Sequence, residues 1–302
     1  EMGSSEHQPA PQRLVDLLAG VLTKRVMQGG NSIGGAISDD GALIGADFKP
    51  FYSWMRGKDL GVTTWPKEMW KQGASAPWGW VSYDPDLNEI YYGTSNPGPR
   101  VPSQRPGLNL WSSAVFARDA TSGAAKWAYQ FTPHDEWDYD GINENVLIEI
   151  PWKGARRKVL VHFNRNGFAY TIDRVTGEVL VAEQFGHQNW AKKIDLATGM
   201  PVVNDAAHPI VEKKVENICP PDIGVKNWNP SAFSPRTGLL YAGIFNTCMD
   251  LTNHIVKYIP GSPYDGMEMV RHPGPGGNWG EFIAWDPVKG KRVWSLKEDM
   301  MT

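Results

Sequence analysis

Four carboxylates lie close together near the middle of the chain. They fall within six residues and are Asp135, Glu136, Asp138 and Asp140. Carboxylates packed on one loop repel one another unless a cation lies among them or water solvates them. The stretch is therefore either a solvated acidic turn or a cation-binding segment.

The residues between these carboxylates favour a cation site. Trp137 and Tyr139 alternate with the last two aspartates, and on an extended segment successive side chains point to opposite faces. This pattern predicts that Asp138 and Asp140 share one face and that the aromatic rings share the other. Two carboxylates with oxygen-rich neighbours suit a hard cation such as calcium.

Two further polar residues have side chains suited to a bound ligand. Asn96 precedes Pro97, where it is either a turn residue or the donor of an amide oxygen to a hard cation. Arg165 lies in the turn-like run from Asn164 to Gly167. From its residue type and position alone, it is a surface arginine in a turn.

An aromatic pair suits a planar ligand. Trp78 is two residues from Trp80, so on a regular strand both indoles point to the same face. A bulge at Gly79 would separate them. An indole offers a flat surface on which a planar ring stacks, and a tryptophan of the hydrophobic core is the alternative interpretation.

The two cysteines, Cys219 and Cys248, lack the spacing of a metal-binding motif. A single disulfide formed in an oxidising compartment is the favoured interpretation. Two buried thiols in a cytosolic protein are the alternative.

The overall charge excludes some classes of partner. A net charge of −3 and a pI of about 6.2 provide no general attraction to nucleic acid or anionic membranes. No run approaches the roughly 18 apolar residues that span a bilayer. The first residues are acidic and polar, unlike a signal peptide, so we expect any export signal to lie outside this chain.

Short strands must position these side chains. The 32 Gly and 23 Pro indicate many tight turns, whereas residues 1–35 have apolar residues at helical spacing and predict one amphipathic helix on a tail. From about residue 78, runs rich in Val, Ile, Tyr and Phe alternate with turns, most of them Asp-x-x-x-Gly. The turns lie at residues 82–88, 117–123, 171–177, 193–199, 233–238 and 284–290.

These turns repeat the same chemistry. An aspartate or serine caps the turn through its side chain, and a glycine or asparagine takes the positive φ. Two copies extend further, because Trp127 and Trp294 each lie eight residues after the aspartate of the turn. Such self-similarity favours the blades of a β-propeller. A β-sandwich, the alternative, has no reason to repeat one corner.

The Asp…Gly…Trp units resemble the tryptophan-docking motif of the pyrroloquinoline-quinone (PQQ) alcohol and methanol dehydrogenases, and of their lanthanide-dependent members most. The resemblance covers residues 36–302 and implies an all-β fold, a partial eight-bladed β-propeller with about half of the blades, preceded by a non-matching tail over residues 1–35. Its other motifs are Tyr92 to Pro99, Gln104 to Gly107, Thr132 to Tyr139 and Asn164 to Gly167.

The resemblance implies PQQ-dependent oxidation of a primary alcohol to an aldehyde. Asp138 matches the catalytic base of the family. Arg165 matches the basic residue that hydrogen-bonds the quinone carbonyl beside that base. Trp78 matches the indole beneath the quinone, and Asn227 matches a further asparagine that contacts the cofactor.

The resemblance also implies a metal ion that polarises the quinone. Asn96, Asp138 and Asp140 match its ligands. Asp140 corresponds to the extra acidic residue of the lanthanide-dependent members, where the calcium-dependent methanol dehydrogenases have a small residue. Because an added carboxylate favours a trivalent over a divalent cation, we expect a lanthanide, with calcium as the alternative.

The resemblance further implies where the protein works. Cys219 and Cys248 match the family's inter-strand disulfide. The expected location is the periplasm, where electrons from a small alcohol pass to a c-type cytochrome. A homodimer is compatible with the resemblance, and neither a nucleic-acid partner nor a membrane span is expected.

The chain also departs from the family pattern. Arg100 replaces a tryptophan that walls the substrate pocket, and Ala76 replaces a threonine that hydrogen-bonds the cofactor. The family's vicinal cysteine pair and metal-binding glutamate belong upstream, so we expect this chain to be inactive alone. A non-catalytic propeller scaffold of the cell envelope is the alternative function, although a scaffold has no use for the polar set of Asn96, Asp138, Asp140 and Arg165 at one site.

Overall fold

Strands dominate the part of the chain that the computed structural model describes, residues 51–52, 55, 61–72 and 75–300. The amphipathic helix expected within residues 1–35 lies outside these ranges. The described helices are single 3-10 turns, η3 (Val62–Thr64), η4 (Met69–Lys71), η5 (Pro102–Gln104) and η6 (Asp205–Ala207). None of the helices in these ranges is long and apolar enough to cross a membrane.

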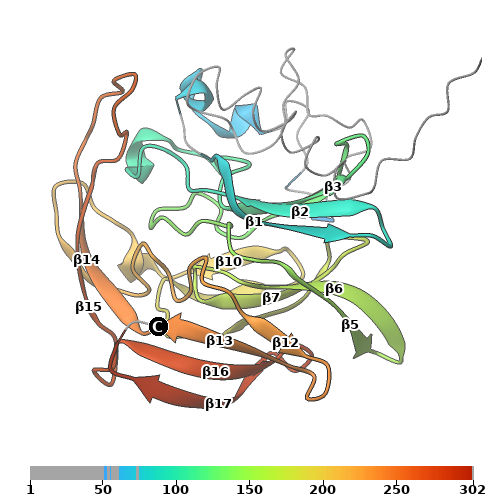
Figure 1. The fold of residues 1–302 in the computed structure, drawn as a ribbon. Helices are drawn as coiled ribbons and strands as arrows, with labels where there is room; N and C mark the ends of the chain where they lie inside the picture. Colours follow the sequence, from blue (N-terminus) through green and yellow to red (C-terminus); the bar gives the residue numbers. More distant parts are fainter. Residues whose placement is uncertain (1–50, 53–54, 56–60, 73–74, 301–302) are drawn as a thin grey trace, which may run out of the picture.

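Three four-stranded antiparallel sheets form successive layers of the molecule (Figure 1). The first contains β1 (Pro77–Asp84), β2 (Glu89–Thr94), β3 (Ala114–Asp119) and β4 (Ala125–Gln130). The second contains β5 (Val146–Trp152), β6 (Ala155–Phe163), β7 (Phe168–Asp173) and β8 (Val179–Gln184). The third contains β12 (Ala232–Ser234), β13 (Leu239–Phe245), β16 (Gly280–Asp286) and β17 (Lys291–Glu298), in that order.

Two smaller sheets complete the described fold. One pairs β9 (Ala191–Asp195) with β10 (Met200–Val203), and the other orders β11 (Val215–Ile218), β14 (Thr247–Asn253) and β15 (Met267–Pro273). The first two larger sheets are meanders of consecutive strands, which is the topology of propeller blades. The third has the same antiparallel arrangement, but β14 and β15 lie between β13 and β16 in the sequence. The predicted all-β fold and partial β-propeller are therefore confirmed, and the β-sandwich is not the fold of this chain.

The predicted turns join strands as expected. In the β3–β4 turn, Asp119 Oδ1 accepts the N–H groups of Thr121 at 3.0 Å and Ser122 at 2.8 Å. Asp173 and Asp286 cap the β7–β8 and β16–β17 turns in the same way. The glycine or asparagine that closes each predicted turn has a positive φ. The proposed mechanism is therefore confirmed for the turns capped by aspartate, whereas in the 233–238 turn it is the carbonyl of Ser234 that accepts the N–H of Gly238.

The first tryptophan of the repeated motif docks one blade on the next. Trp127, from the first blade, is 1% exposed and donates its indole N–H to the carbonyl of Arg174 at 2.7 Å. Trp294, in the third blade, is 41% exposed and has its ring contacts with Tyr241 and Phe282 of the same sheet. The first copy of the motif therefore locks two adjacent blades, whereas the tryptophan of the second copy is exposed among the described residues.

Two glycines test this docking contact. Gly177 and Gly238 close equivalent turns with φ of +76° and +70°, so alanine strains the backbone alike at both. A Cβ on Gly177 would lie 2.9 Å from the Trp127 indole, whereas nothing lies within 4 Å of one on Gly238. We expect Gly177→Ala to lower the free energy of unfolding by about 1–3 kcal/mol more than Gly238→Ala. Urea denaturation of both variants measures the difference, and equal losses would contradict the packed contact.

Candidate active site

The structure brings the predicted site residues together from separate parts of the chain. The contributing segments are strand β1, the loop after β2, the long connection between β4 and β5, the β6–β7 turn and the connection after β11. In that order they supply Trp78, Asn96, the pair Asp138 and Asp140, Arg165, and Asn227. The site therefore depends on how two neighbouring blades and the adjoining loops are packed.

Arg165 contacts most of the other predicted residues. Its Nη1 lies 3.2 Å from Asp140 Oδ2 and 3.8 Å from Asp138 Oδ2. Its Nη2 donates to the side-chain oxygen of Asn227 at 3.3 Å. The carbon of the guanidinium group lies 5.5 Å from the centre of the Trp78 ring, within the range of a cation–π contact. Arg165 is therefore the residue that links the acidic, amide and aromatic parts of the site.

The segment after β11 holds Arg165 from the other side. Gly224 has a φ of +80°, and a Cβ there would lie 2.5 Å from the Cα of Arg165, so only glycine permits this approach. Val225 donates its N–H to the carbonyl of Arg165 at 2.9 Å. Arg165 in turn donates to the carbonyl of Asp222 at 3.2 Å, and Arg271 pairs with the Asp222 carboxylate at 2.5 Å.

The acidic stretch is buried, so it is not a solvated turn. Asp138 and Asp140 are only 5% and 3% exposed. The predicted extended segment is wrong, because Asp138 has a left-handed φ of +75° and no strand forms there. The expected separation of rings and carboxylates still holds. Trp137 and Tyr139 are buried and stack on each other at 5.6 Å, while both aspartates lie beside Arg165.

The other two carboxylates hold the loop in shape. Asp135 accepts the N–H groups of Trp137 at 3.0 Å and Tyr139 at 2.7 Å, together with the hydroxyl of Ser113 at 2.9 Å. Glu136 pairs with His208 at 2.9 Å. The repulsion expected among four carboxylates is thus reduced to one close pair, because half of the set is used structurally.

Charge is concentrated on the remaining pair. Burial raises the pKa of Asp138 well above its ordinary value and Asp140 raises it further, while Arg100 and Arg165 oppose the shift. Burial also raises the pKa of Asp140, against the effect of Arg165 and of the Asn96 N–H, which donates to its Oδ1 at 2.5 Å. Oδ1 of Asp138 is buried and accepts no hydrogen bond from the described residues. An uncompensated carboxylate oxygen beside a second carboxylate fits a hard cation.

The described part of the chain supplies an incomplete ligand set. Asn96 directs its side-chain NH₂ to the carbonyl of Pro97 at 3.0 Å, which leaves the amide oxygen available. Within the described ranges, three His, Cys, Asp or Glu side chains come close enough to share a metal ion only where His187 lies beside the two cysteines, and those sulfurs are bonded to each other. A cation held by Asn96, Asp138 and Asp140 would therefore need further ligands from elsewhere.

The aromatic pair is divided by a bulge. Gly79 has a φ of +83°, and the β1–β2 register shifts between Pro77 and Val81. Trp78 is 43% exposed with one face toward Arg165, so it is not a tryptophan of the core. Trp80 donates its indole N–H to the carbonyl of Trp228 at 2.7 Å.

A cavity of about 550 Å³ opens beside this centre. It is lined by Trp80, Ile223, Asn227, Trp228, Asn229, Pro230, Phe245 and Arg271. Mostly apolar walls with a few polar groups are typical of a small-molecule site, and the aromatic lining fits a planar ring. Among these residues, only Asn227 was predicted from the sequence to contact a cofactor, and Trp80 was considered as the neighbour of Trp78. The sequence signal that could have identified Trp228 and Asn229 is the run Asn227-Trp228-Asn229, in which an aromatic residue is flanked by two amide side chains.

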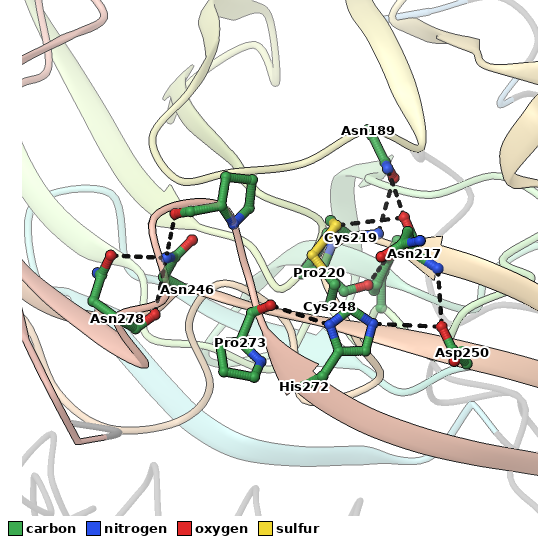
Figure 2. The surroundings of a disulfide bond; sticks show 12 residues. Asn189, Asn217, Cys219, Pro220, Asn246, Cys248, Asp250, His272, Pro273 and Asn278 are labelled. Carbon is green, nitrogen blue, oxygen red and sulfur yellow. Dashed lines mark hydrogen bonds and ion pairs between the residues drawn. A yellow bond between two sulfur atoms is a disulfide. The ribbon is translucent and has the colours of Figure 1, made fainter.

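The predicted disulfide between Cys219 and Cys248 is confirmed (Figure 2). Both cysteines are buried, and the bond joins the start of the segment that carries Asp222 and Asn227 to strand β14. Asn189 accepts the N–H of Cys219 at 2.8 Å. The crosslink therefore fixes the segment that packs on Arg165, and the alternative of two free thiols is wrong.

Comparisons with known proteins agree with this geometry. A family model described as glucose/ethanol/alcohol dehydrogenase, β-propeller domain, of the PQQ type, matches residues 49–186. The chain is 47% identical over 256 residues to a lanthanide-dependent methanol dehydrogenase of Methylorubrum extorquens, covering 80% of the chain and 42% of that protein. It is 37% identical over 267 residues to methanol dehydrogenase [cytochrome c] subunit 1 of Paracoccus denitrificans, covering 86% and 42%.

The fold comparison extends the match. A solved structure of a europium-containing methanol dehydrogenase superposes with a TM-score of 0.83 and 42% identity, covering 87% of this chain and 46% of that one. The chain thus spans less than half of the length of these relatives. Its sequence motifs, its propeller blades and its relatives together establish that the chain belongs to the PQQ-dependent (quinoprotein) dehydrogenase family.

Proposed function

We propose that this chain contributes the catalytic base and part of the cofactor site of a PQQ-dependent alcohol dehydrogenase, which oxidises a primary alcohol to an aldehyde. The observation that carries the proposal is the buried pair of Asp138 and Asp140 beside Arg165, with one carboxylate oxygen unpaired. When bound, PQQ supplies a two-electron oxidant and the metal supplies Lewis-acid polarisation.

Asp138 is the base in this proposal. Its Oδ2 lies 3.0 Å from Arg100 and 3.8 Å from Arg165, so this oxygen is held by cations. Its Oδ1 is unpaired among the described residues and is available to take the proton of a substrate hydroxyl. Burial and Asp140 raise the pKa of Asp138, which makes it a stronger proton acceptor than an exposed carboxylate.

Arg165 and the aromatic residues orient the cofactor. Arg165 is nearly buried and is held by Asn227 and by the carbonyls of Asp138 and Asp222, so its charge is fixed where negative charge develops during oxidation. Trp78 lies over its guanidinium group and presents an exposed indole to a planar ring. Asn227 borders the cavity and supplies an amide.

Asn96, Asp138 and Asp140 are the proposed metal ligands. Their donors are oxygens, which hard cations prefer, and two of them are buried carboxylates. The second carboxylate favours a lanthanide over calcium because the attraction grows with the charge of the cation. The relatives named as lanthanide-dependent support this assignment.

The proposed setting is the periplasm, with a c-type cytochrome as the electron acceptor. The disulfide supports an oxidising compartment, and a relative is named a cytochrome c methanol dehydrogenase. We propose that residues 36–302 form the propeller portion and that residues 1–35 are a separate tail. Val293, Trp294 and Leu296 on β17 are exposed, which supports our expectation that this chain alone does not turn over.

Removal of the base tests the reaction. We expect Asp138→Asn in the full-length, PQQ-loaded protein to lower kcat for a primary alcohol about 10²- to 10⁴-fold, because the amide keeps the shape but cannot accept the proton. Steady-state oxidation with an artificial electron acceptor measures kcat, and the absorption spectrum confirms that PQQ is bound. The exposed Asp86, which pairs with Lys158, provides the matched control Asp86→Asn. Wild-type kcat in the Asp138 variant would exclude this base.

Titration of the metal-free protein tests the cation. We expect La³⁺ to restore alcohol oxidation at a lower concentration than Ca²⁺, and Asp140→Asn to raise the La³⁺ requirement about 10-fold or more, because one of the two clustered negative charges is lost. Terbium luminescence measures binding independently of activity. Restoration by Ca²⁺ alone would exclude the lanthanide, and a protein that binds no quinone with any cation would be a scaffold.

A further inference from the structure

Arg100 occupies a position that the proposed reaction does not use. Its Nη2 lies 3.0 Å from Asp138 Oδ2, and its Nε lies 3.7 Å from Asp265 Oδ1. Its backbone N–H donates to the carbonyl of Asp265 at 2.8 Å, and the adjacent Val101 is fully buried. The guanidinium group is thus held beside the base by a fixed backbone.

Arg100 differs from Arg165 in how many of its N–H donors are used by the described residues. The side chain of Arg165 is 8% exposed, and its Nη atoms bond to two backbone carbonyls and to Asn227. The side chain of Arg100 is 27% exposed. Among the described residues its ion pairs with Asp138 and Asp265 are its polar side-chain contacts. Since a guanidinium group carries five N–H donors in a planar fork, Arg100 has donors left for a ligand.

The unpaired oxygen of the proposed base and the oxygen that Arg100 contacts belong to one carboxylate group. The oxygen of Asp138 that is unpaired, Oδ1, adjoins the oxygen that Arg100 contacts, Oδ2. When a substrate hydroxyl binds to Oδ1, the group attached to the hydroxyl-bearing carbon therefore lies within reach of the Arg100 guanidinium group. If that substituent were an alkyl group, the remaining N–H donors of Arg100 would have no partner on the substrate. Because the arginine side chain is mostly buried, leaving these donors unpaired lowers the binding affinity. A carboxylate pairs with them in bidentate fashion.

The charge of Arg100 is secure. A guanidinium group does not lose its proton in proteins, and that of Arg100 lies 3.0 Å from Asp138 Oδ2 and 3.7 Å from Asp265 Oδ1. Asp265 is itself nearly half-exposed and 3.7 Å away, so solvent screens its repulsion of an anion. A permanent, partly accessible cation therefore faces the place where the substrate binds.

We propose that Arg100 binds a carboxylate on the substrate, so that the preferred alcohols are short primary hydroxy acids of the glycolate type. This inference rests on the proposed function. The O–H and one C–H bond of the carbinol break and a C=O bond forms. The hydroxyl proton passes to Asp138, and the hydride, with its two electrons, is accepted by the quinone oxidant. The product is the corresponding aldehyde acid.

Glycolate and ethanol test the inference, because they have the same number of carbons and differ by a carboxylate in place of a methyl group. With the full-length protein loaded with PQQ and its activating cation, we expect a higher kcat/KM for glycolate. Arg100→Gln should lower the glycolate-to-ethanol ratio of kcat/KM about 10- to 100-fold, mainly through the KM for glycolate. Acetate should inhibit ethanol oxidation competitively in the wild type and not in this variant.

Two variants separate recognition from general damage. Arg100→Lys keeps the charge and should recover part of the glycolate preference. Arg156, an exposed arginine paired with Glu149, provides the control Arg156→Gln, which should leave the ratio unchanged. Ethanol oxidation without glycolate oxidation and without acetate inhibition in the wild type would overturn the inference and leave the proposed function intact. Oxidation of neither alcohol by the loaded wild type would overturn both.

Discussion

The burial of two neighbouring carboxylates is the constraint on which the rest of the site depends. Asp138 and Asp140 are almost fully removed from solvent, where like charges are costly unless cations compensate them. Arg165 and Arg100 supply part of this compensation. One oxygen of Asp138 has no hydrogen-bond partner among the described residues. In the proposed function, a metal ion and a substrate hydroxyl provide the compensation that is still needed there.

The β-propeller creates this environment because loops at the ends of strands from several sheets lie close together. The docked Trp127 fixes the first blade against the second, which sets the acidic connection after β4 against the turn that carries Arg165. Glycine at position 224 then lets the segment after β11 approach that turn closely. Rigid strands hold the loops, and the loops carry the chemistry, as is common in folds that support catalysis.

Local chemistry made much of the fold predictable. The turns at Asp119, Asp173 and Asp286 could be predicted because one side chain and one glycine determine each of them. The resemblance to the family predicted that Asp138, Asp140 and Arg165 lie at one site. The sequence could not show that Asp135 accepts the hydroxyl of Ser113, or that Arg100 lies against Asp138, because these contacts depend on packing between segments distant along the chain. The extended form expected around Asp138 failed because the left-handed φ of that residue arises from the folded loop.

The disulfide ties the assembly of the site to the chemistry of the cysteines. Cys219 begins the segment whose Asp222 and Asn227 restrain Arg165, and Cys248 anchors it to β14. Until this bond forms, that segment has a larger conformational entropy, and the arginine lacks part of its support. Maturation of the charged centre is therefore coupled to oxidative folding, although no sulfur atom belongs to the proposed catalytic set.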